Sequence, residues 1–167
     1  NIALMVNFMS GLASAFAILF MFWSISILVR KISGPAESLS FSGKLAVLGS
    51  AAVGSLAFTF TDSFWFSAVE AEVYAAAACL MSIMFYLGLL WERDMFESRG
   101  NKWLILISLV TGLTFGIHFM GLLTIPAIGF LYFFKNYPKV TIKNFIIANI
   151  VVVAVLLFIF KLLLPYT

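Results

Sequence analysis

The chain has 167 residues, of which 63% are hydrophobic and 10% are charged, and its formal net charge is +3. Soluble domains carry about 25% charged residues, and a water-soluble fold of this length cannot bury so large an apolar fraction. The composition therefore excludes a soluble protein and predicts that lipid is the solvent. In a membrane protein the positions of Lys and Arg matter more than their sum, so the positive charge does not indicate a nucleic-acid partner.

Long apolar runs account for most of the sequence: 2–29, 45–61, 73–91, 103–134 and 145–164. A hydrocarbon core of about 30 Å takes roughly 20 helical residues, and lipid offers no hydrogen-bond partner to an open backbone. The runs do not alternate between polar and apolar residues, which argues against a β-barrel. We therefore expect an all-α, polytopic transmembrane helical bundle that forms one domain over 1–167. Because Asn1 already lies in apolar sequence, we expect a piece of a larger protein.

The basic residues predict how the bundle is oriented. Nine of the ten Lys and Arg residues lie in three connections between the runs: Arg30, Lys31, Lys44, Arg93, Arg99, Lys102, Lys135, Lys139 and Lys143. Cytoplasmic loops of membrane proteins carry such an excess of cations. We therefore expect loops 30–44, 92–102 and 135–143 to be cytoplasmic, in a bacterial inner membrane. The connection at 62–72 has no Lys or Arg and would face the opposite side.

The run 103–134 separates two of these basic loops, so it must cross the membrane an even number of times. As a single helix it would be about 48 Å long, far more than one crossing needs. Helix-loosening residues gather near its middle: Gly112, Gly116, Gly121 and Pro126. Such breaks are tolerated in membranes where they line a cavity within the protein. The run therefore predicts a short re-entrant or hairpin pair at 103–134, which brings the bundle to about six membrane helices.

Three carboxylates lie within eleven residues in the connection that has no Lys or Arg: Asp62, Glu70 and Glu72. If a helix begins near Ser63, Glu70 and Glu72 lie about 200° apart on it and cannot form a paired-carboxylate site. Glu72 would then face a seam of small residues and would need a partner there. It is either a ligand for a substrate hydroxyl, a metal or a cation, or a helix N-terminal cap. Capping suits Asp62 best.

His118, the only histidine, lies at the expected tip of the hairpin. It could serve as a proton relay, a phosphate contact or a metal ligand, or it could be a polar residue hydrogen-bonded at the bend. The single cysteine, Cys79, excludes an internal disulfide and a Cys-based zinc site. Small residues at a spacing of four predict close helix packing at three places: Gly11/Ala15, Ser50/Gly54 and Gly112/Gly116.

Two stretches carry more specific information: FWFSAVEAEVYAAAACL (64–80) and GLTFGIHFMGLLTIPAI (112–128). They resemble segments of the GT-C membrane glycosyltransferases, and look most like the protein O-mannosyltransferase-like family. The first is similar to a segment that opens a transmembrane helix, where an acidic residue precedes an aromatic residue and an alanine run. The second is similar to a glycine-rich hairpin ending in a Pro-Ala pair. His118 stands where related enzymes often carry a basic residue.

The resemblance implies a membrane enzyme that moves a sugar from a polyprenyl-phosphate donor to a hydroxyl of a protein or glycan on the extracytoplasmic face. Its partners would be the lipid-linked donor, the acceptor and membrane lipids, with no nucleic acid. The need for a divalent metal stays open. Such enzymes carry their catalytic Asp or Glu between their first and second helices. This sequence departs there, since it begins at the second helix, and the resemblance implies that the general base lies upstream of Asn1.

Glu70, Glu72 and His118 would then have supporting roles. The resemblance implies that Glu72 or Glu70 orients the acceptor or the sugar. It implies that His118 contacts the donor phosphate and offsets the charge on the leaving group. Two other classes stay open on the residues alone. Broken helices and acids at membrane depth also suit a transporter or flippase segment, and a non-catalytic structural subunit would tolerate the loss of Glu72 and His118.

Overall fold

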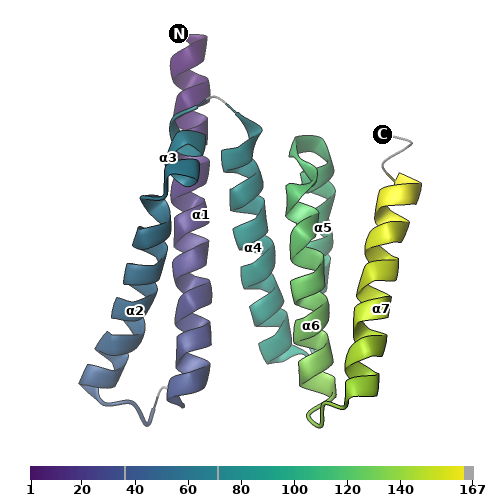
Figure 1. Ribbon diagram of the computed structural model, residues 1–167. Coiled ribbons are helices and arrows are strands. Elements are labelled where there is room, and N and C mark those ends of the chain that lie inside the picture. The colour runs from purple at the N-terminus through teal and green to yellow at the C-terminus, as the bar shows by residue number, and fades with distance from the viewer. Residues whose placement is uncertain (36, 71, 164–167) are drawn as a thin grey trace. The chain divides into compact units, whose positions relative to one another are not determined.

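Figure 1 shows a computed structural model of the chain, which describes residues 1–35, 37–70 and 72–163. These residues form helices and no strand, in two compact units that are described separately. The first unit, residues 1–124, contains α1 (Ile2–Ser33), α2 (Phe41–Thr59), α3 (Asp62–Val69), α4 (Val73–Asp94), α5 (Asn101–Ile117) and the 3₁₀ helix η1 (Phe119–Leu123). The second unit, residues 125–167, contains α6 (Thr124–Asn136) from its second residue on, α7 (Ile142–Phe158) and the π-type turn η2 (Ile159–Leu163).

Among the described residues, five helical segments are long and apolar enough to cross a membrane: Ile2–Ser33, Phe41–Thr59, Val73–Asp94, Phe119–Asn136 and Ile142–Lys161. α5 is apolar but shorter. Together they confirm the predicted polytopic helical bundle, with the run 103–134 divided into a short arm and a longer one. Leu164, the predicted end of the last run, lies outside the described residues.

Within the first unit, α1 packs against α2, α3 and α4. It buries only small residues, Ser10, Ser14, Ala17 and Ser24. Lipid gives no hydrophobic drive for helices to associate, so small side chains that allow close backbone approach favour this packing. Two of the buried hydroxyls bond within their own helices: Ser24 Oγ donates to the Phe20 carbonyl, and Ser55 Oγ on α2 donates to the Ala51 carbonyl, both at 2.8 Å. These bonds satisfy the hydrogen-bonding groups of hydroxyls that have no water as a partner.

The acidic connection does not form the single helix from near Ser63 on which the positions of Glu70 and Glu72 were considered. α3 ends at Val69 and α4 begins at Val73, and both Glu70 and Glu72 have extended backbone. The Glu72 N–H donates to the Glu70 carbonyl at 2.9 Å, which closes a tight turn. Charged side chains are costly at membrane depth, so the chain turns at this point before α4 enters the bundle. The helical face that the sequence assigned to each glutamate therefore does not exist. Ala71 lies outside the described residues.

The helix break predicted within 103–134 is confirmed at His118. α5 ends at Ile117, and His118 has extended backbone with φ −165° and ψ 135°. The following η1 contacts both α4 and α5. A Cβ on Gly121 of η1 would lie 2.3 Å from Thr114 Cγ2 on α5, so only glycine fits at this approach. The chain thus folds back on itself locally, and 103–134 is not a single rod.

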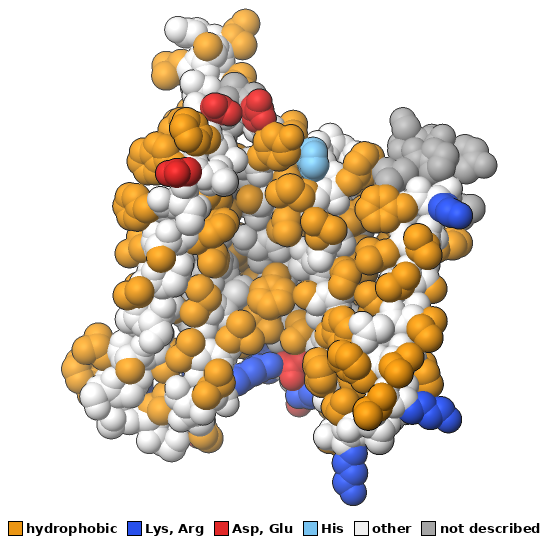
Figure 2. Space-filling model, in the orientation of Figure 1, with side chains coloured by type: hydrophobic (Ala, Val, Ile, Leu, Met, Phe, Trp, Pro, Cys, Tyr) orange, Lys and Arg blue, Asp and Glu red, His pale blue; other side chains and the backbone are white. Residues whose placement is uncertain are grey.

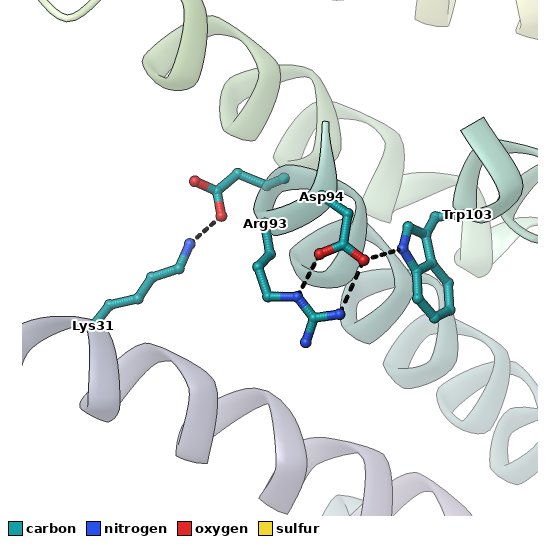
Figure 3. Close-up of polar contacts among 5 residues, drawn as sticks. Lys31, Arg93, Asp94 and Trp103 are labelled. Atoms are coloured by element: carbon teal, nitrogen blue, oxygen red, sulfur yellow. Dashed lines mark hydrogen bonds and ion pairs between the residues drawn. The ribbon is translucent and has the colours of Figure 1, made fainter. Parts of the chain in front are cut away.

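Polar contacts join helix ends at the other end of the first unit (Figure 3). Lys31 on α1 forms an ion pair with Glu92 on α4. Arg93 donates from Nε and Nη2 to the two carboxylate oxygens of Asp94, at 2.6 and 2.9 Å. Asp94 also accepts a hydrogen bond from the Trp103 indole at 2.8 Å, which connects α4 to α5.

In the second unit, aromatic rings connect α6 and α7. Phe130 stacks with Phe145 at a centroid distance of 6.0 Å, and Phe133 lies edge-on to Phe145 at 6.4 Å. Gly129 approaches Val152 closely, since a Cβ there would lie 3.2 Å from a Val152 methyl carbon. Among its described residues α7 buries none, as expected of a helix with a large lipid-facing surface.

Candidate functional site

A cleft of about 580 Å³ opens in the first unit at the end that carries the acidic connection. The N-terminal half of α1, the start of α4 and the end of α5 form its walls: Val6, Met9, Ser10, Ala13, Glu72, Val73, Tyr74, Ala76 and Ile117. Most of these side chains are apolar. Figure 2 shows acidic side chains and the histidine toward this end of the unit. The cleft can therefore hold an apolar chain beside a small number of polar groups.

Glu72 lines the cleft from the N-cap position of α4, where its backbone φ is −121° and ψ is 165°. Its side chain makes no capping hydrogen bond to the described residues, although negative charge is favourable at a helix N-terminus. The prediction that Glu72 faces a small-residue seam is wrong. Ala75 and Cys79 are buried, whereas Glu72 is exposed, because α4 begins only after it. The carboxylate is thus free to accept hydrogen bonds in the cleft.

His118 is held at the break between α5 and η1. Its Nδ1 accepts a hydrogen bond from the Met120 N–H at 3.1 Å, so the side chain caps η1. The structure thus bears out the interpretation of a histidine hydrogen-bonded at the bend. Because Nδ1 acts as an acceptor, the neutral imidazole carries its proton on Nε2. No described residue bonds to Nε2, which is therefore an available donor in this half-buried ring.

Tyr74 links the histidine to the cleft. Its ring lies 5.3 Å from the His118 ring, centroid to centroid, and Tyr74 itself lines the cleft two residues after Glu72. Ile117, next to His118, lines the same cleft. The fold thus brings Glu72, Tyr74 and His118 together from two segments far apart in the sequence.

The other two carboxylates are not part of this group. Glu70 follows the last residue of α3, is exposed and does not line the cleft. Asp62 opens α3, where its charge is favourable, but no side-chain hydrogen bond caps that helix among the described residues. Nor do three or more His, Cys, Asp or Glu side chains of residues 1–35, 37–70 and 72–163 gather as metal ligands.

Besides Glu72, the cleft has two polar lining residues that sequence reasoning did not assign to a site, Tyr74 and Ser10. A continuous helix would have placed Tyr74 on the face of Glu70, and the turn at 70–72 removes that relation. Ser10 is only 6% exposed, on the buried face of α1. The signal that could have found it is the spacing of Ser10, Ser14 and Ala17, small residues three to four apart.

Comparison with known families shows which family the chain matches. The family model described as Protein O-mannosyl-transferase TMEM260 N-terminal domain matches residues 1–141. No curated protein and no solved structure matches the chain. The matched region includes the cleft and both stretches whose resemblance to this superfamily was noted in the sequence, and it confirms that resemblance.

Proposed function

The chain belongs to the TMEM260 N-terminal domain family of GT-C protein O-mannosyltransferases, and on this premise we propose that its cleft forms part of a sugar-transfer site. In the proposed reaction the bond between the sugar's anomeric carbon and the donor phosphate breaks. A bond from the same carbon to an acceptor hydroxyl forms, and the hydroxyl proton passes to a general base. The phosphate leaves with additional negative charge.

The observation that carries the proposal is an apolar cleft lined by Glu72 and Tyr74, with the His118 ring in contact with the Tyr74 ring beside it. The apolar walls, including Val6 and Ile117, suit the prenyl chain of a lipid-linked donor. An Nε2–H donor on His118 suits a phosphate oxygen whose charge grows as the bond breaks.

Glu72 is the glutamate we assign to the sugar or acceptor hydroxyl, because it lines the cleft and Glu70 does not. An exposed carboxylate accepts hydrogen bonds from hydroxyls and orients them without becoming protonated. Family membership favours transfer over a transporter or a purely structural subunit.

The test separates the chemistry of His118 from its capping role. In the full-length protein, His118→Asn keeps a side-chain acceptor for the Met120 N–H but removes the imidazole donor. We expect His118→Asn and Glu72→Gln each to lower mannosyl transfer from polyprenyl-phosphate mannose by roughly 10²-fold, with normal membrane insertion.

Asp62→Asn is the matched control, since it removes a carboxylate from the same end of the unit but outside the cleft. It should transfer sugar at the wild-type rate. Wild-type transfer by both Glu72→Gln and His118→Asn would refute the assigned site. A loss in His118→Ala alone, with His118→Asn active, would assign His118 to capping only.

A further inference from the structure

A second cleft, of about 530 Å³, is lined by the C-terminal ends of α1 and α4. In the first unit these two ends lie opposite the connection between α3 and α4 (Figure 1). The end of α1, the turn that follows it and the end of α4 form its walls: Ile27, Arg30, Lys31, Gly34, Pro35, Glu37, Leu89 and Arg93. We propose that this cleft binds the phosphate group of an anionic membrane phospholipid. The proposal is independent of the sugar-transfer site.

The cations of the cleft retain donors for a ligand. Lys31 uses one N–H on Glu92, and Arg93 uses Nε and Nη2 on Asp94 (Figure 3). The ammonium of Lys31 keeps two N–H groups, and Nη1 of Arg93 makes no hydrogen bond to a described residue. The carboxylates therefore fix the positions of two cations without using all of their donors.

Arg30 supplies the third cation. It is exposed and lines the cleft, and its side chain has no hydrogen-bond or ion-pair partner among residues 1–35, 37–70 and 72–163. The lining thus contains three cations and one carboxylate, Glu37. Counted with the ion-paired Glu92 and Asp94, the charges at this end balance, so the remaining N–H donors, and not an excess of positive charge, would hold the phosphate.

The apolar part of the lining favours a lipid over a soluble anion. Ile27, Pro35 and Leu89 lie in the same cleft as the cations. The helices that carry these residues are candidate membrane spans that end here, so the cleft lies where a phospholipid places its headgroup above its acyl chains. Basic pockets between membrane helices are known to bind anionic headgroups, with each nearby Lys or Arg strengthening the attraction.

The experiment measures lipid retention by the full-length protein after extraction from vesicles of phosphatidylcholine containing phosphatidylglycerol. Arg30→Gln is the informative change, because Arg30 has no structural partner to lose. We expect it to reduce bound phosphatidylglycerol about fivefold. Glu37→Gln removes the one carboxylate of the lining and should increase retention. Arg99→Gln, a neighbouring basic residue outside the cleft, should leave it unchanged.

Opposite shifts in Arg30→Gln and Glu37→Gln would support a phosphate site in the cleft. Equal losses in Arg30→Gln and Arg99→Gln would overturn it and indicate attraction by overall charge. A further arm adds glycerol 1-phosphate, which has the phosphate but no acyl chains. If that anion displaces phosphatidylglycerol at equal concentration, the site is for a soluble anion and the lipid proposal fails.

Discussion

At the residue scale, Gly121 shows how the hairpin tip depends on one close contact. Thr114 on α5 is fully buried, and its Cγ2 occupies the space that a Cβ on Gly121 would need. The Thr114 hydroxyl is also engaged, since it donates to the Thr111 carbonyl at 2.6 Å. This contact holds η1 against α5 and so positions His118, which caps η1 and whose ring lies beside that of Tyr74.

We expect Gly121→Ala to destabilise the protein by about 1–3 kcal/mol, because a Cβ at 2.3 Å forces the backbone apart. Adding Thr114→Ser should restore part of the loss, since it removes Cγ2 and keeps the hydroxyl. Thermal unfolding of the purified full-length protein would measure both. Gly116→Ala is the matched control, because nothing lies within 4 Å of its Cβ position. An unchanged melting temperature in Gly121→Ala would contradict the contact.

At the element scale, the membrane spans could be predicted from the sequence, but only one of the two helix breaks could. Apolar runs locate helices because lipid forces each run to satisfy its own backbone, and the predicted start at residue 73 is where α4 begins. The helix break at His118 could also be predicted from the sequence, because glycines gather there. The turn at Glu70–Glu72 was not predicted, because the helical faces of the two glutamates were worked out for one unbroken helix from near Ser63.

The face that each helix packs against its neighbours was the hardest feature of the helices to predict. Gly112 and Gly116, which share a spacing typical of helix contacts, have nothing within 4 Å of their Cβ positions. Ala15 is exposed, and α1 instead buries a face that includes Ser10 and Ser14. Small residues at a spacing of four permit close packing but do not select it, because the neighbouring helices decide which face is covered.

A prediction at this scale concerns the attachment of α3. Phe64 is its one buried residue among those described, 6% exposed and in a cluster with Ala17 and Cys79. Phe64→Ala should destabilise the protein by about 2 kcal/mol, mainly through the cavity it leaves, since lipid weakens the hydrophobic contribution. Thermal unfolding is the measurement. Phe66→Ala removes a side chain that is 59% exposed on the same helix, so it should change the stability little. Equal losses of stability in both variants would contradict this packing.

At the scale of the whole molecule, charge separates the two ends of the first unit. One end carries Asp62, Glu70 and Glu72 around the acidic turn, and the other carries the ion pairs of Lys31 and Arg93. The cation-rich end also contains the acids Glu92 and Asp94. The sequence alone did not predict that they pair with Lys31 and Arg93. The positive-inside rule counts Lys and Arg and gives little weight to Asp and Glu, so the predicted orientation does not depend on these acids.

Orientation and the crossing number of 103–134 can be tested together with single cysteines in a Cys79→Ala background. A cysteine replacing Phe66 should react with an impermeant thiol reagent from the extracytoplasmic side, and one replacing Glu97 only from the cytoplasm. Lys139→Cys should behave like Glu97→Cys, because a helix pair at 103–134 returns the chain to the side where it began. Labelling of Lys139→Cys from the side of Phe66→Cys would mean an odd number of crossings, and would contradict the expected cytoplasmic location of all three basic loops.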